Sequence, residues 1–554
     1  MKTVIEYVLE RLQTLGINEV FGVAGDYAFP IEDAVCASET LRWIGNCNEL
    51  NAAYAADGYA RIKGVAALST TFGVGELSAL NGLAGSYAEH LPVFHLVGMP
   101  ASAVQKNHRL VHHTLGNGDF DVFYQISQHL SCAHAILTPE NCIDETERLI
   151  TTALKERRPV YMGIPSDYAV MPVIANAQHK KSAQNEKTEP PKSDEQSLDA
   201  AVNAIVDKLN ASQKACIIPG ILAARLGYSD DVQAIIDKTG LPYATMFMDK
   251  SIVSESNPTY MGIYNGKLMN AQVGEFVESC DCILGIGAVL TDFNSGSFTA
   301  SISPDQGINI LADQVKVGSA IYPNVRMKEV LDKLQILAPS LKHHGIAAQG
   351  LGEPRQGDNG QITAQYLYPR LEKMFKEHDI VIGETGTASM GLVFALLPKD
   401  AQFHNQTLWG SIGWATPAAF GAAIAAPNKR VILVTGEGSH QLTAQEISQF
   451  ARFGLKPIVF VLNNDGYLIE RLLCKEPEAY YNDLPRWNYA QLPAALGCTD
   501  WYCQKVTTCD ELDFAIKQAE VIDSAAYIEI VMDRYAASDL AEKIGQSVAS
   551  LYSF

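Results

Sequence analysis

The sequence predicts an α/β protein of three doubly wound parallel-sheet domains. Short aliphatic runs typical of buried strands, for example residues 431–434 and 458–462, alternate with stretches of helical periodicity such as residues 444–453. With 554 residues, the chain is also too long to fold around a single hydrophobic core. Alternating strands and helices are the pattern of parallel sheets, and the length suits three such domains.

The first domain is expected over residues 1–177. It begins with an amphipathic helix whose capping box pairs Thr3 with Glu6, which is not the pattern of a signal peptide. Strands are then expected at residues 20–23, 66–71 and 93–97, and residues 48–61 form a helix whose alanine face suits close packing. This alternation again predicts a parallel sheet.

Two polar stretches rich in Pro or Gly predict linkers at residues 178–197 and 342–360. Between them lies a middle domain, residues 198–341, with strands expected at residues 215–218, 282–286 and 308–311. Its Gly285-Ile286-Gly287 lacks the rest of a dinucleotide fingerprint, so we interpret it as a turn. The third domain occupies residues 361–554 and ends in a helix after Tyr535, which we expect to cover the mouth of a site.

Composition excludes several classes of partner. The formal net charge of −20 is the opposite of what nucleic-acid binding requires. No apolar run is long enough to cross a bilayer, so we expect no membrane association. The eleven cysteines are odd in number, and the close pair Cys280 and Cys282 lacks a second pair for a zinc site. This usage is typical of reduced thiols, and we expect a cytoplasmic protein.

Two turns in the third domain carry the strongest functional signal. One strand leads into Gly436-Glu437-Gly438, and the next leads into Asn463-Asn464-Asp465-Gly466. Because parallel strands end at the same edge of a sheet, we expect the two turns to be neighbours. Glycines and a following helix start suit a phosphate, although no lysine is present for a Gly-Lys-Ser/Thr phosphate loop.

Three oxygen donors lie in these turns. The carboxylate of Glu437, the amide oxygen of Asn464 and the backbone carbonyl of Gly466 are ligands that Mg2+ or Ca2+ prefers. Each turn alone is better explained as an ordinary connection between a strand and a helix. Because Glu437 and Asn464 lie one strand–helix unit apart, a metal shared with a diphosphate is the favoured interpretation of the two together.

The same turns resemble the thiamine diphosphate motif of the 2-oxo-acid decarboxylases, which include pyruvate, indolepyruvate and branched-chain keto-acid decarboxylases. The similarity rests on Gly-acid-Gly, on Asn-Asn one strand–helix unit later, and on the continuations HQLTAQE and NNDGYLIER. One position departs from the family pattern, since Glu437 stands where the family usually has Asp. Mg2+ demands near-ideal geometry, and glutamate is one methylene longer than aspartate. We expect metal binding to survive because the backbone adjusts to the longer side chain.

The resemblance implies a pyrimidine-binding first domain, a middle domain and a diphosphate-binding third domain. It also implies non-oxidative decarboxylation of a 2-oxo acid to CO2 and the aldehyde one carbon shorter, with thiamine diphosphate and Mg2+ as cofactors. In this family the first domain of one subunit meets the third domain of its neighbour. The implied minimum active unit is therefore a homodimer, and a homotetramer is the usual state.

Residues for proton transfer are implied by further family motifs. Glu49, in NELNAAYAADGYAR, matches the glutamate that hydrogen-bonds the pyrimidine ring; Asp26 lies in AGDY, His112 and His113 lie in HHTLGNG, and Glu470 follows the metal turn. Taken alone, each has an ordinary explanation: a helix-start glutamate, a turn aspartate, histidines of a solvated loop and a surface charge. Their coincidence within family motifs favours the functional interpretation.

The resemblance also assigns the cofactor contacts. The segment Trp409-Gly410-Ser411-Ile412-Gly413 resembles the family's wedge, in which Ile412 would hold the two cofactor rings together. The Gly410 carbonyl would accept a hydrogen bond from the pyrimidine amine. The full set of cofactor-binding residues that we expect is Gly410, Ile412, Gly436, Gly438, Ser439, Asn464, Gly466, Tyr467 and Thr385.

The expected substrate pocket is apolar and roomy. Ser389 lies in a segment that resembles the pocket wall, where pyruvate-restricted bacterial members tend to carry a bulky aromatic residue. A small residue leaves space, so we expect branched, aromatic or medium-chain 2-oxo acids to be preferred over pyruvate. The other pocket residues are Phe293, Met390, Ile469 and Leu473, with Thr71 and Thr385 facing the substrate carboxylate.

Three alternatives stay open. One is a pyruvate decarboxylase proper, since apolar pockets discriminate weakly by size. The second is a thiamine-dependent carboligase such as acetohydroxyacid synthase, although such relatives often bind FAD and lack the paired histidines and the Glu470 motif. The third is a non-enzymatic relative, which the Glu437 departure would explain. Detection of free aldehyde across a panel of 2-oxo acids separates them.

Overall fold

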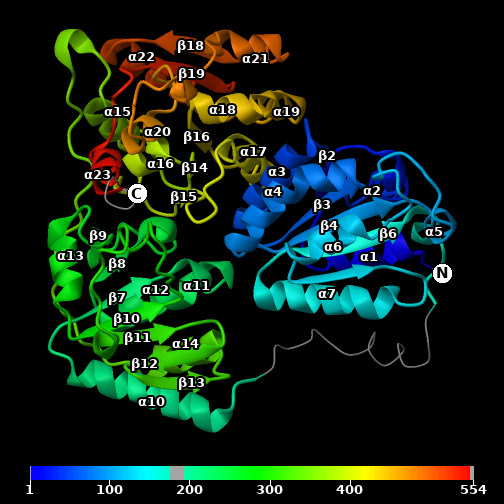
Figure 1. Cartoon of the computed structure of the whole chain (residues 1–554). Coiled ribbons are helices and arrows are strands. Elements are labelled where there is room, and N and C mark those ends of the chain that lie inside the picture. Colours follow the sequence, from blue (N-terminus) through cyan, green and yellow to red (C-terminus); the bar gives the residue numbers. More distant parts are fainter. Residues whose placement is uncertain (1, 175–191, 549–554) are drawn as a thin grey trace. The chain divides into compact units, whose positions relative to one another are not determined.

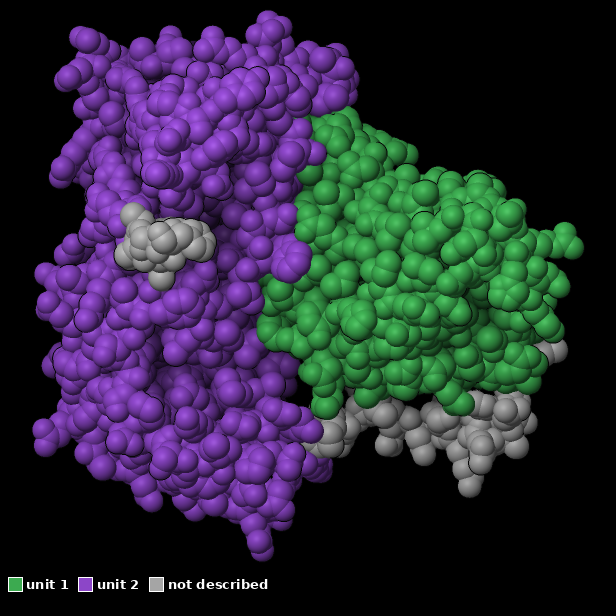
Figure 2. Space-filling view, viewed as in Figure 1, with its two compact units in different colours: residues 1–190, 416–428, 443–455 green, residues 191–415, 429–442, 456–554 purple. Residues whose placement is uncertain are grey.

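The computed structural model describes residues 2–174 and 192–548, which form three sheets flanked by helices (Figure 1). The chain groups into two compact units, which Figure 2 shows in separate colours. Unit 1 contains residues 1–190, 416–428 and 443–455, and unit 2 contains residues 191–415, 429–442 and 456–554. The three mostly parallel sheets agree with the predicted fold class.

Unit 1 is built on a six-stranded parallel sheet in the order β2-β1-β3-β4-β6-β5. The central strands β3 and β4 are buried along their whole length, which accounts for their near-continuous small and apolar residues. The strands are β1 Glu19–Gly22, β2 Arg42–Gly45, β3 Ala66–Thr71, β4 Val93–Met99, β5 Ala133–Ile136 and β6 Val160–Pro165. The helices are α1 Val4–Gln13, α2 Phe29–Ala37, α3 Glu49–Lys63, α4 Val74–Ala88, α5 Ser102–Lys106, α6 Val122–Gln128, α7 Cys142–Glu156, α8 Ser166–Ala169, α17 Ala415–Ala425 and α19 Ile447–Arg452.

Helix α3 fixes the position of Glu49. The Asn48 side chain accepts a hydrogen bond from the Asn51 amide and caps the helix, so Glu49 is its first residue. The alanine face packs as closely as the sequence predicts, because a Cβ added at Gly58 would lie 2.1 Å from the carbonyl oxygen of Ala418 in α17. Small side chains therefore hold the helix that carries Glu49 firmly against its neighbour.

The first sheet of unit 2 has seven strands in the order β13-β12-β11-β10-β7-β8-β9. Its strands β12 and β13 are antiparallel to their neighbours, an extension that the predicted parallel sheet did not include. The strands are β7 Ala215–Pro219, β8 Tyr243–Thr245, β9 Tyr260–Ile263, β10 Cys282–Ile286, β11 Gly307–Ile310, β12 Gln314–Val317 and β13 Ala320–Pro323. The helices are α10 Glu195–Ala211, α11 Ile221–Arg225, α12 Ser229–Thr239, α13 Ala271–Glu278 and α14 Met327–Leu337.

The second sheet of unit 2 repeats the topology of the sheet in unit 1. Its order is β15-β14-β16-β17-β19-β18, so each of the two sheets reads 2-1-3-4-6-5 when counted from its own first strand. The strands are β14 Ile380–Gly383, β15 Gln402–His404, β16 Val431–Gly436, β17 Ile458–Asn463, β18 Tyr502–Val506 and β19 Ala526–Val531. The helices are α15 Ala364–Glu372, α16 Thr387–Leu392, α18 Glu437–Thr443, α20 Leu468–Leu473, α21 Leu492–Ala495, α22 Cys509–Val521 and α23 Asp539–Val548.

Three predicted local features are wrong. Residues 444–453 do not form one helix: Thr443 leaves the helical region at φ −139°, and a 3-10 turn, η5 Ala444–Glu446, precedes α19. Glu437 and Gly438 are not in a loop, because α18 begins at Glu437 directly after β16. The predicted linker 178–197 ends too late, since the Asp194 side chain caps α10; its residues 178–191 lie outside the described residues.

One further local prediction agrees with the structure. The capping box of Thr3 and Glu6 is present at the start of α1. All eleven cysteines are free thiols. No helix within residues 2–174 or 192–548 combines the length and the apolar character that crossing a bilayer requires.

Candidate active site

The two predicted turns are neighbours in unit 2. Strands β16 and β17 are parallel and adjacent, with Gly436 opposite Leu462, so the segments that follow them begin at the same sheet edge. Glu437 is the first residue of α18, and Asn464 directly follows β17. The fold therefore brings a carboxylate and an amide oxygen to one place, as the metal prediction requires.

The Glu437 carboxylate is buried and joins the two strand ends. Its Oε1 accepts hydrogen bonds from the backbone amides of Asn464 (3.1 Å) and Gly466 (2.9 Å), and its Oε2 accepts from that of Asn464 (3.2 Å). Burial raises the pKa of Glu437 to about 7, and the amide donors act in the opposite direction. The side chain, one methylene longer than aspartate, thus reaches across to the second turn.

Arg471, which sequence reasoning did not single out, holds the other side of that turn. Its guanidinium donates to the carbonyl oxygens of Asp465 (2.6 Å) and Asn464 (3.4 Å) and to the Asp483 carboxylate (3.2 Å). The side chain is almost fully buried. The available sequence signal was a cationic residue about one helical turn after the predicted metal turn, because the long arginine side chain can reach back to the carbonyls of that turn.

This sheet edge fits a divalent cation that shares its ligands with an anion. Asn464 Oδ1 is buried and has no hydrogen-bond partner in the described structure. A Cβ added at Gly436 would meet nothing within 4 Å, so space is open at the end of β16. An orphaned amide oxygen beside the buried Glu437 carboxylate is a hard-oxygen donor set of the kind that Mg2+ bound to a diphosphate requires.

The predicted wedge segment lies beside the turn that follows β14. Thr385 Oγ1 donates to the Gln406 carbonyl oxygen (2.9 Å), and Gln406 Oε1 accepts from the Ser411 amide (3.0 Å). A Cβ added at Gly410 would lie 3.9 Å from Thr385 Cγ2, so these two predicted cofactor contacts are adjacent. Ile412, in the same segment, is half-buried.

Two further buried side chains that sequence reasoning missed support this segment. The Glu384 carboxylate accepts from the backbone amides of Thr385 (3.0 Å) and Ala415 (3.3 Å), and burial raises its pKa to about 7. Gln406 is fully buried, and its Nε2 has no partner in the described structure. The sequence signals were weak: Glu384 directly follows the apolar strand β14, and Gln406 is the second residue after β15.

The remaining predicted cofactor contacts surround the start of α18. A Cβ added at Gly438 would lie 2.5 Å from the Tyr467 ring, so a glycine is needed against that side chain. The Ser439 carbonyl oxygen lies 3.2 Å from the place of a Cβ at Gly413. These contacts place the wedge segment, α18 and the second turn in one neighbourhood of unit 2.

Four predicted pocket residues share one apolar cluster in unit 2. Met390 is a buried member of the cluster, and Phe293, Ile469 and Leu473 pack against it. The same cluster includes buried side chains of α23, the helix predicted after residue 535, which packs against α16 and α20. The structure thus brings together pocket residues that lie up to 180 positions apart, from Phe293 to Leu473.

Ser389 and Glu470 flank this cluster in sequence. Ser389 is 2% exposed, and its Oγ donates to the Gly386 carbonyl oxygen (3.1 Å). A Cβ added at Gly386 would lie 3.6 Å from Ile469 Cγ2, which puts the start of α16 next to α20. Glu470, on α20, is exposed.

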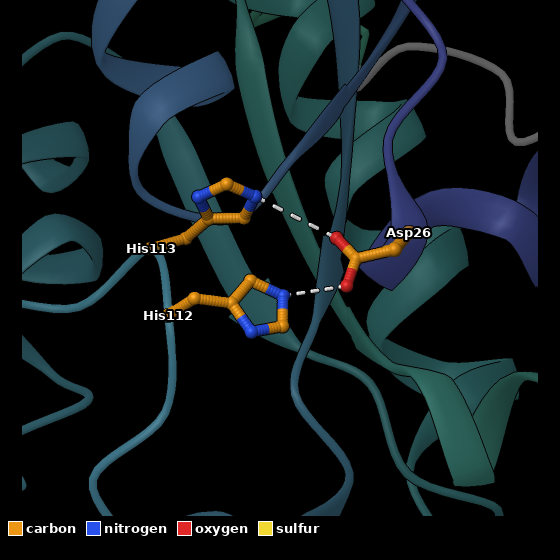
Figure 3. Close-up of side chains that lie close together, drawn as sticks. All are labelled: Asp26, His112 and His113. Carbon is orange, nitrogen blue, oxygen red and sulfur yellow. Dashed lines mark hydrogen bonds and ion pairs between the residues drawn. The ribbon is translucent and has the colours of Figure 1, made fainter.

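In unit 1, Asp26, His112 and His113 converge (Figure 3). Asp26 Oδ2 lies 2.6 Å from His112 Nε2, and Asp26 Oδ1 lies 3.7 Å from His113 Nε2. Tyr27 stacks on the His112 ring, with centroids 4.9 Å apart and planes 11° apart. The structure therefore groups three of the predicted proton-transfer residues, taken from segments that follow β1 and β4.

Glu49 and Thr71 meet at another point of unit 1. A Cβ added at Gly75 would lie 3.1 Å from Thr71 Cγ2 and 3.3 Å from Glu49 Oε1. Thr71 Oγ1 is buried and has no hydrogen-bond partner in the described structure, while Glu49 is half-buried. An orphaned hydroxyl beside a carboxylate is suited to a polar ligand.

The predicted residues occupy equivalent strand ends of the two sheets with equal order. In unit 1, Asp26 follows β1 and Thr71 ends β3; in unit 2, Thr385 follows β14 and Glu437 follows β16. Strands β14 and β16 hold the places of β1 and β3 in their sheet. Both sheets thus present their candidate residues at the carboxyl ends of corresponding strands, where α/β proteins bind ligands.

Comparisons with known proteins bear on this arrangement. Three family profiles match: the N-terminal thiamine pyrophosphate-binding domain of thiamine pyrophosphate enzymes over residues 2–121, their central domain over residues 202–334, and their C-terminal thiamine pyrophosphate-binding domain over residues 384–530. A solved structure, the thiamine diphosphate-dependent 4-hydroxybenzoylformate decarboxylase of Rhodococcus jostii RHA1, has the same fold: TM-score 0.77 at 19% identity, covering 96% of this chain and 99% of that one.

Curated relatives match nearly the whole chain. Pyruvate decarboxylase isozyme 3 of Saccharomyces cerevisiae is 40% identical over 528 residues, which cover 94% of this chain and 93% of the yeast protein. The alpha-keto-acid decarboxylase of Mycobacterium leprae is 38% identical over 541 residues, covering 96% and 93%. On these matches and on its fold, the chain belongs to the thiamine diphosphate-dependent 2-oxo-acid decarboxylases, and it is a carboxy-lyase.

Proposed function

We propose that this enzyme decarboxylates branched, aromatic or medium-chain 2-oxo acids in preference to pyruvate, releasing CO2 and the aldehyde one carbon shorter. The observation that carries the proposal is the apolar cluster of Met390, against which Phe293, Ile469 and Leu473 pack. Ser389 adds little bulk beside it, and its hydroxyl is already bonded to backbone. A larger apolar substrate gains about 25 cal/mol for each Å2 of apolar surface that it buries there.

The names of the relatives span both substrate classes. The mycobacterial relative is named for alpha-keto acids, and the yeast relative is named for pyruvate. Each missing methylene contact in an apolar pocket weakens binding of the transition state by about 1–3 kcal/mol. We therefore propose a broad enzyme for which pyruvate is a poor substrate. The carboligase alternative is not favoured, because both relatives are named as decarboxylases.

Glu437, Asn464 and Gly466 are the proposed ligands of Mg2+, and the orphaned Asn464 Oδ1 supports this role. The diphosphate is proposed to lie in the open space beside Gly436. Bound thiamine diphosphate supplies a carbon nucleophile and an electron sink for decarboxylation. The chain's part is to hold the metal and to orient the cofactor; the other proposed contacts are Gly410, Ile412, Gly438, Ser439, Tyr467 and Thr385.

Five side chains are proposed to handle protons. Glu49 would hydrogen-bond the cofactor's pyrimidine ring. Asp26 lies between the Nε2 atoms of His112 and His113, so a proton held there can be shared with either ring. Glu470, exposed on α20, is proposed to exchange protons with substrate and product.

Measurement of aldehyde release from a panel of 2-oxo acids tests the substrate proposal. We expect kcat/KM to be highest for branched, aromatic or medium-chain acids. The Ser389→Phe variant should shift the preference toward pyruvate, whereas Ser389→Ala, which only removes the bond to Gly386, should leave the ranking unchanged. Pyruvate as the best substrate of the unaltered enzyme would refute the preference, and coupled products without aldehyde would favour a carboligase.

We also propose a cytoplasmic enzyme whose minimum active unit is a homodimer, with a homotetramer as the usual assembly. The dimer proposal assigns Glu49 and the metal turn of one site to different subunits. Mixing inactive Glu49→Gln subunits with inactive Asn464→Ala subunits should then restore part of the activity. Sedimentation as an active monomer, or no recovery after demonstrated subunit exchange, would contradict this arrangement.

A further inference from the structure

Asp26, His112 and His113 have the composition of a transition-metal site. Among the residues that the structure describes, they form the one group of three His, Cys, Asp or Glu side chains whose ligand atoms all lie within 4.8 Å of one another. Two imidazole nitrogens and one carboxylate are donors that Zn2+ and similar first-row dications prefer. Nothing in the proposed reaction uses this property.

We propose that these three side chains bind a first-row transition-metal dication, Zn2+ being the best match, and that the bound cation inhibits the enzyme reversibly. The binding part stands on the geometry of unit 1 alone. The inhibition part rests on the proposed function, in which the same three groups carry protons.

The donor atoms need only small adjustments to hold a cation. Zn–N and Zn–O bonds of about 2.0–2.2 Å place tetrahedral ligand atoms roughly 3.3 Å apart. One donor atom from each residue lies within 4.8 Å of the other two, and the shortest separations are 2.6 Å from Asp26 Oδ2 to His112 Nε2 and 3.7 Å from Asp26 Oδ1 to His113 Nε2. Figure 3 shows the two Nε2 atoms directed at the two oxygens of one carboxylate.

The surrounding residues hold the histidines in this arrangement. Tyr27 stacks on His112, meets His113 edge-on at 5.9 Å, and donates from its hydroxyl to the His112 carbonyl oxygen (3.3 Å). His113 adopts φ +62°, and its carbonyl oxygen lies 2.1 Å from the place of a Cβ at Gly73, so the segment packs tightly on Gly73. Such preorganised ligands lose less conformational entropy when a metal binds.

Access to the cluster is open on its solvent side. The side chains of His112, Asp26 and His113 are 59%, 42% and 31% exposed. A cation can therefore enter from water, and water can supply its remaining ligands, as in zinc sites with an open position. The proposed Mg2+ site offers only oxygen donors from Glu437, Asn464 and Gly466, so the two sites should select different metals.

The chemistry of coordination explains the inhibition. Metal binding needs both imidazole nitrogens unprotonated and the carboxylate ionised. With the cation in place, His112, His113 and Asp26 hold no proton at the atoms that face one another, so they can no longer exchange protons. Removal of the metal by a chelator allows these atoms to exchange protons again. The inhibition is reversible because no covalent change of the protein is involved.

Titration calorimetry of Zn2+ into the cofactor-free full chain tests the binding part. We expect one equivalent to bind, and Asp26→Asn and His113→Ala each to weaken that binding by at least about 10- to 100-fold, the loss that even outer-shell substitutions cause at metal sites. The control is His378→Ala, which removes the exposed His378–Asp400 pair, a histidine and carboxylate 3.7 Å apart without a second histidine. It should bind like the unaltered chain.

Two further readouts complete the test. Co2+ bound to the cluster should give a visible absorption band of low-coordinate cobalt, absent in Asp26→Asn and present in His378→Ala. In the loaded enzyme with excess Mg2+, Zn2+ should stop aldehyde release, and a chelator should restore it. Zn2+ binding that survives in the Asp26 and His113 variants would overturn the proposal. Zn2+ binding that leaves the turnover of the unaltered enzyme unchanged would also overturn it. If the loaded enzyme released no aldehyde even before Zn2+ was added, that result would count only against the proposed decarboxylation.

Discussion

Two sheet edges within unit 2 are both formed by the carboxyl ends of parallel strands but differ in what they offer a ligand. In the middle domain, strands β7, β8 and β10 end around the start of α11; in the third domain, β14, β16 and β17 end around the start of α18. Carboxyl ends of parallel strands are where doubly wound folds bind ligands, so both edges are candidates on topology alone.

The middle-domain edge is closed by its own atoms. The amides of Gly220, Ile221 and Leu222 donate to the Ile286 carbonyl (2.8 Å), the Asp249 carboxylate (2.7 Å) and the Gly287 carbonyl (3.1 Å). Asp249 thus occupies the position at a helix start where a bound anion would stand. Within residues 192–341, no buried side-chain nitrogen or oxygen lacks a hydrogen-bond partner. The predicted turn Gly285-Ile286-Gly287 is wrong for its first two residues, which are the last two of β10; only Gly287 lies past the strand, at φ +70°.

The third-domain edge is open. Space lies beside Gly436, and the buried atoms Asn464 Oδ1 and Gln406 Nε2 have no partner in the described structure. The comparison teaches that topology provides a binding edge but does not make a site. The difference lies in what is left over once the strand-end carboxylate has accepted its backbone amides. Nothing buried is left over around Asp249, whereas beside Glu437 the Asn464 Oδ1 atom has no partner in the described structure and space is open at Gly436.

The largest expected change in stability comes from a substitution at the closed edge of the middle domain. A Cβ added at Gly220 would lie 2.2 Å from backbone atoms of Ala288, which cannot move aside like a flexible side chain. Gly220→Ala should therefore lower the free energy of unfolding by about 3 kcal/mol, the upper end of overpacking effects. Urea denaturation of the cofactor-free chain measures it. Unchanged stability would mean that the middle-domain edge is less tightly packed than its contacts indicate.

The matched substitution at the open edge of the third domain should leave stability unchanged and weaken cofactor binding. Gly436→Ala adds a methyl group where nothing lies within 4 Å, so the cofactor-free chain should keep its stability within about 0.5 kcal/mol. If the diphosphate lies beside Gly436 as proposed, the same methyl group would displace it, and we expect about 100-fold weaker binding of thiamine diphosphate. Calorimetric titration in the presence of Mg2+ checks this. Full affinity in a stable variant would show that the cofactor does not lie beside Gly436.

Local sequence signals were sufficient to predict the open edge of the third domain. The Gly-acid-Gly and Asn-Asn turns each follow a short apolar strand, and parallel pairing of β16 with β17 makes them neighbours without further information. The family resemblance added Asp26, His112 and His113, which the structure brings together across two segments. These predictions depended on residues close in sequence to a recognisable strand end or motif.

Long-range packing decided the rest. The equal order of the first and third sheets depends on which strands pair, and no local pattern records that. Asp249, Glu384 and Gln406 gain their roles from backbone groups elsewhere in the chain, so their own sequence surroundings were uninformative. The predicted helix over residues 444–453 failed because periodicity does not distinguish the 3-10 turn over residues 444–446 from the first turn of an α-helix.

The buried carboxyl of the closed edge should be visible in the pH dependence of stability. Burial raises the pKa of Asp249 from 3.8 to about 7, while amide donors and the charge of Arg225 lower it. The folded state therefore favours the neutral acid, and stability is lost as pH rises from the unfolded pKa through 7. In Asp249→Asn this loss disappears, so the variant should gain about 2 kcal/mol relative to the unaltered chain between pH 5 and pH 8.

Urea denaturation at pH 5, 6, 7 and 8 measures this difference. The matched control is Asp281→Asn, because Asp281 also accepts backbone amides in the middle domain but is exposed. Its stability difference from the unaltered chain should vary less with pH. Parallel pH curves for Asp249→Asn and the unaltered chain would show that Asp249 stays ionised in the fold.

The smallest expected effect asks whether Glu437 acts as an internal bridge, like Asp249, or as a metal ligand. Glu437→Asp shortens the side chain, so the bonds to the amides of Asn464 (3.1 Å) and Gly466 (2.9 Å) should weaken. We expect the cofactor-free chain to lose about 1 kcal/mol of stability, the net value of one such hydrogen bond. Glu437→Gln keeps the length but removes the charge, and it should lower Mg2+ affinity more than Glu437→Asp does. Titration of Mg2+ with saturating thiamine diphosphate compares the two; if the Gln variant bound Mg2+ as well as the Asp variant, the carboxylate would serve the fold alone.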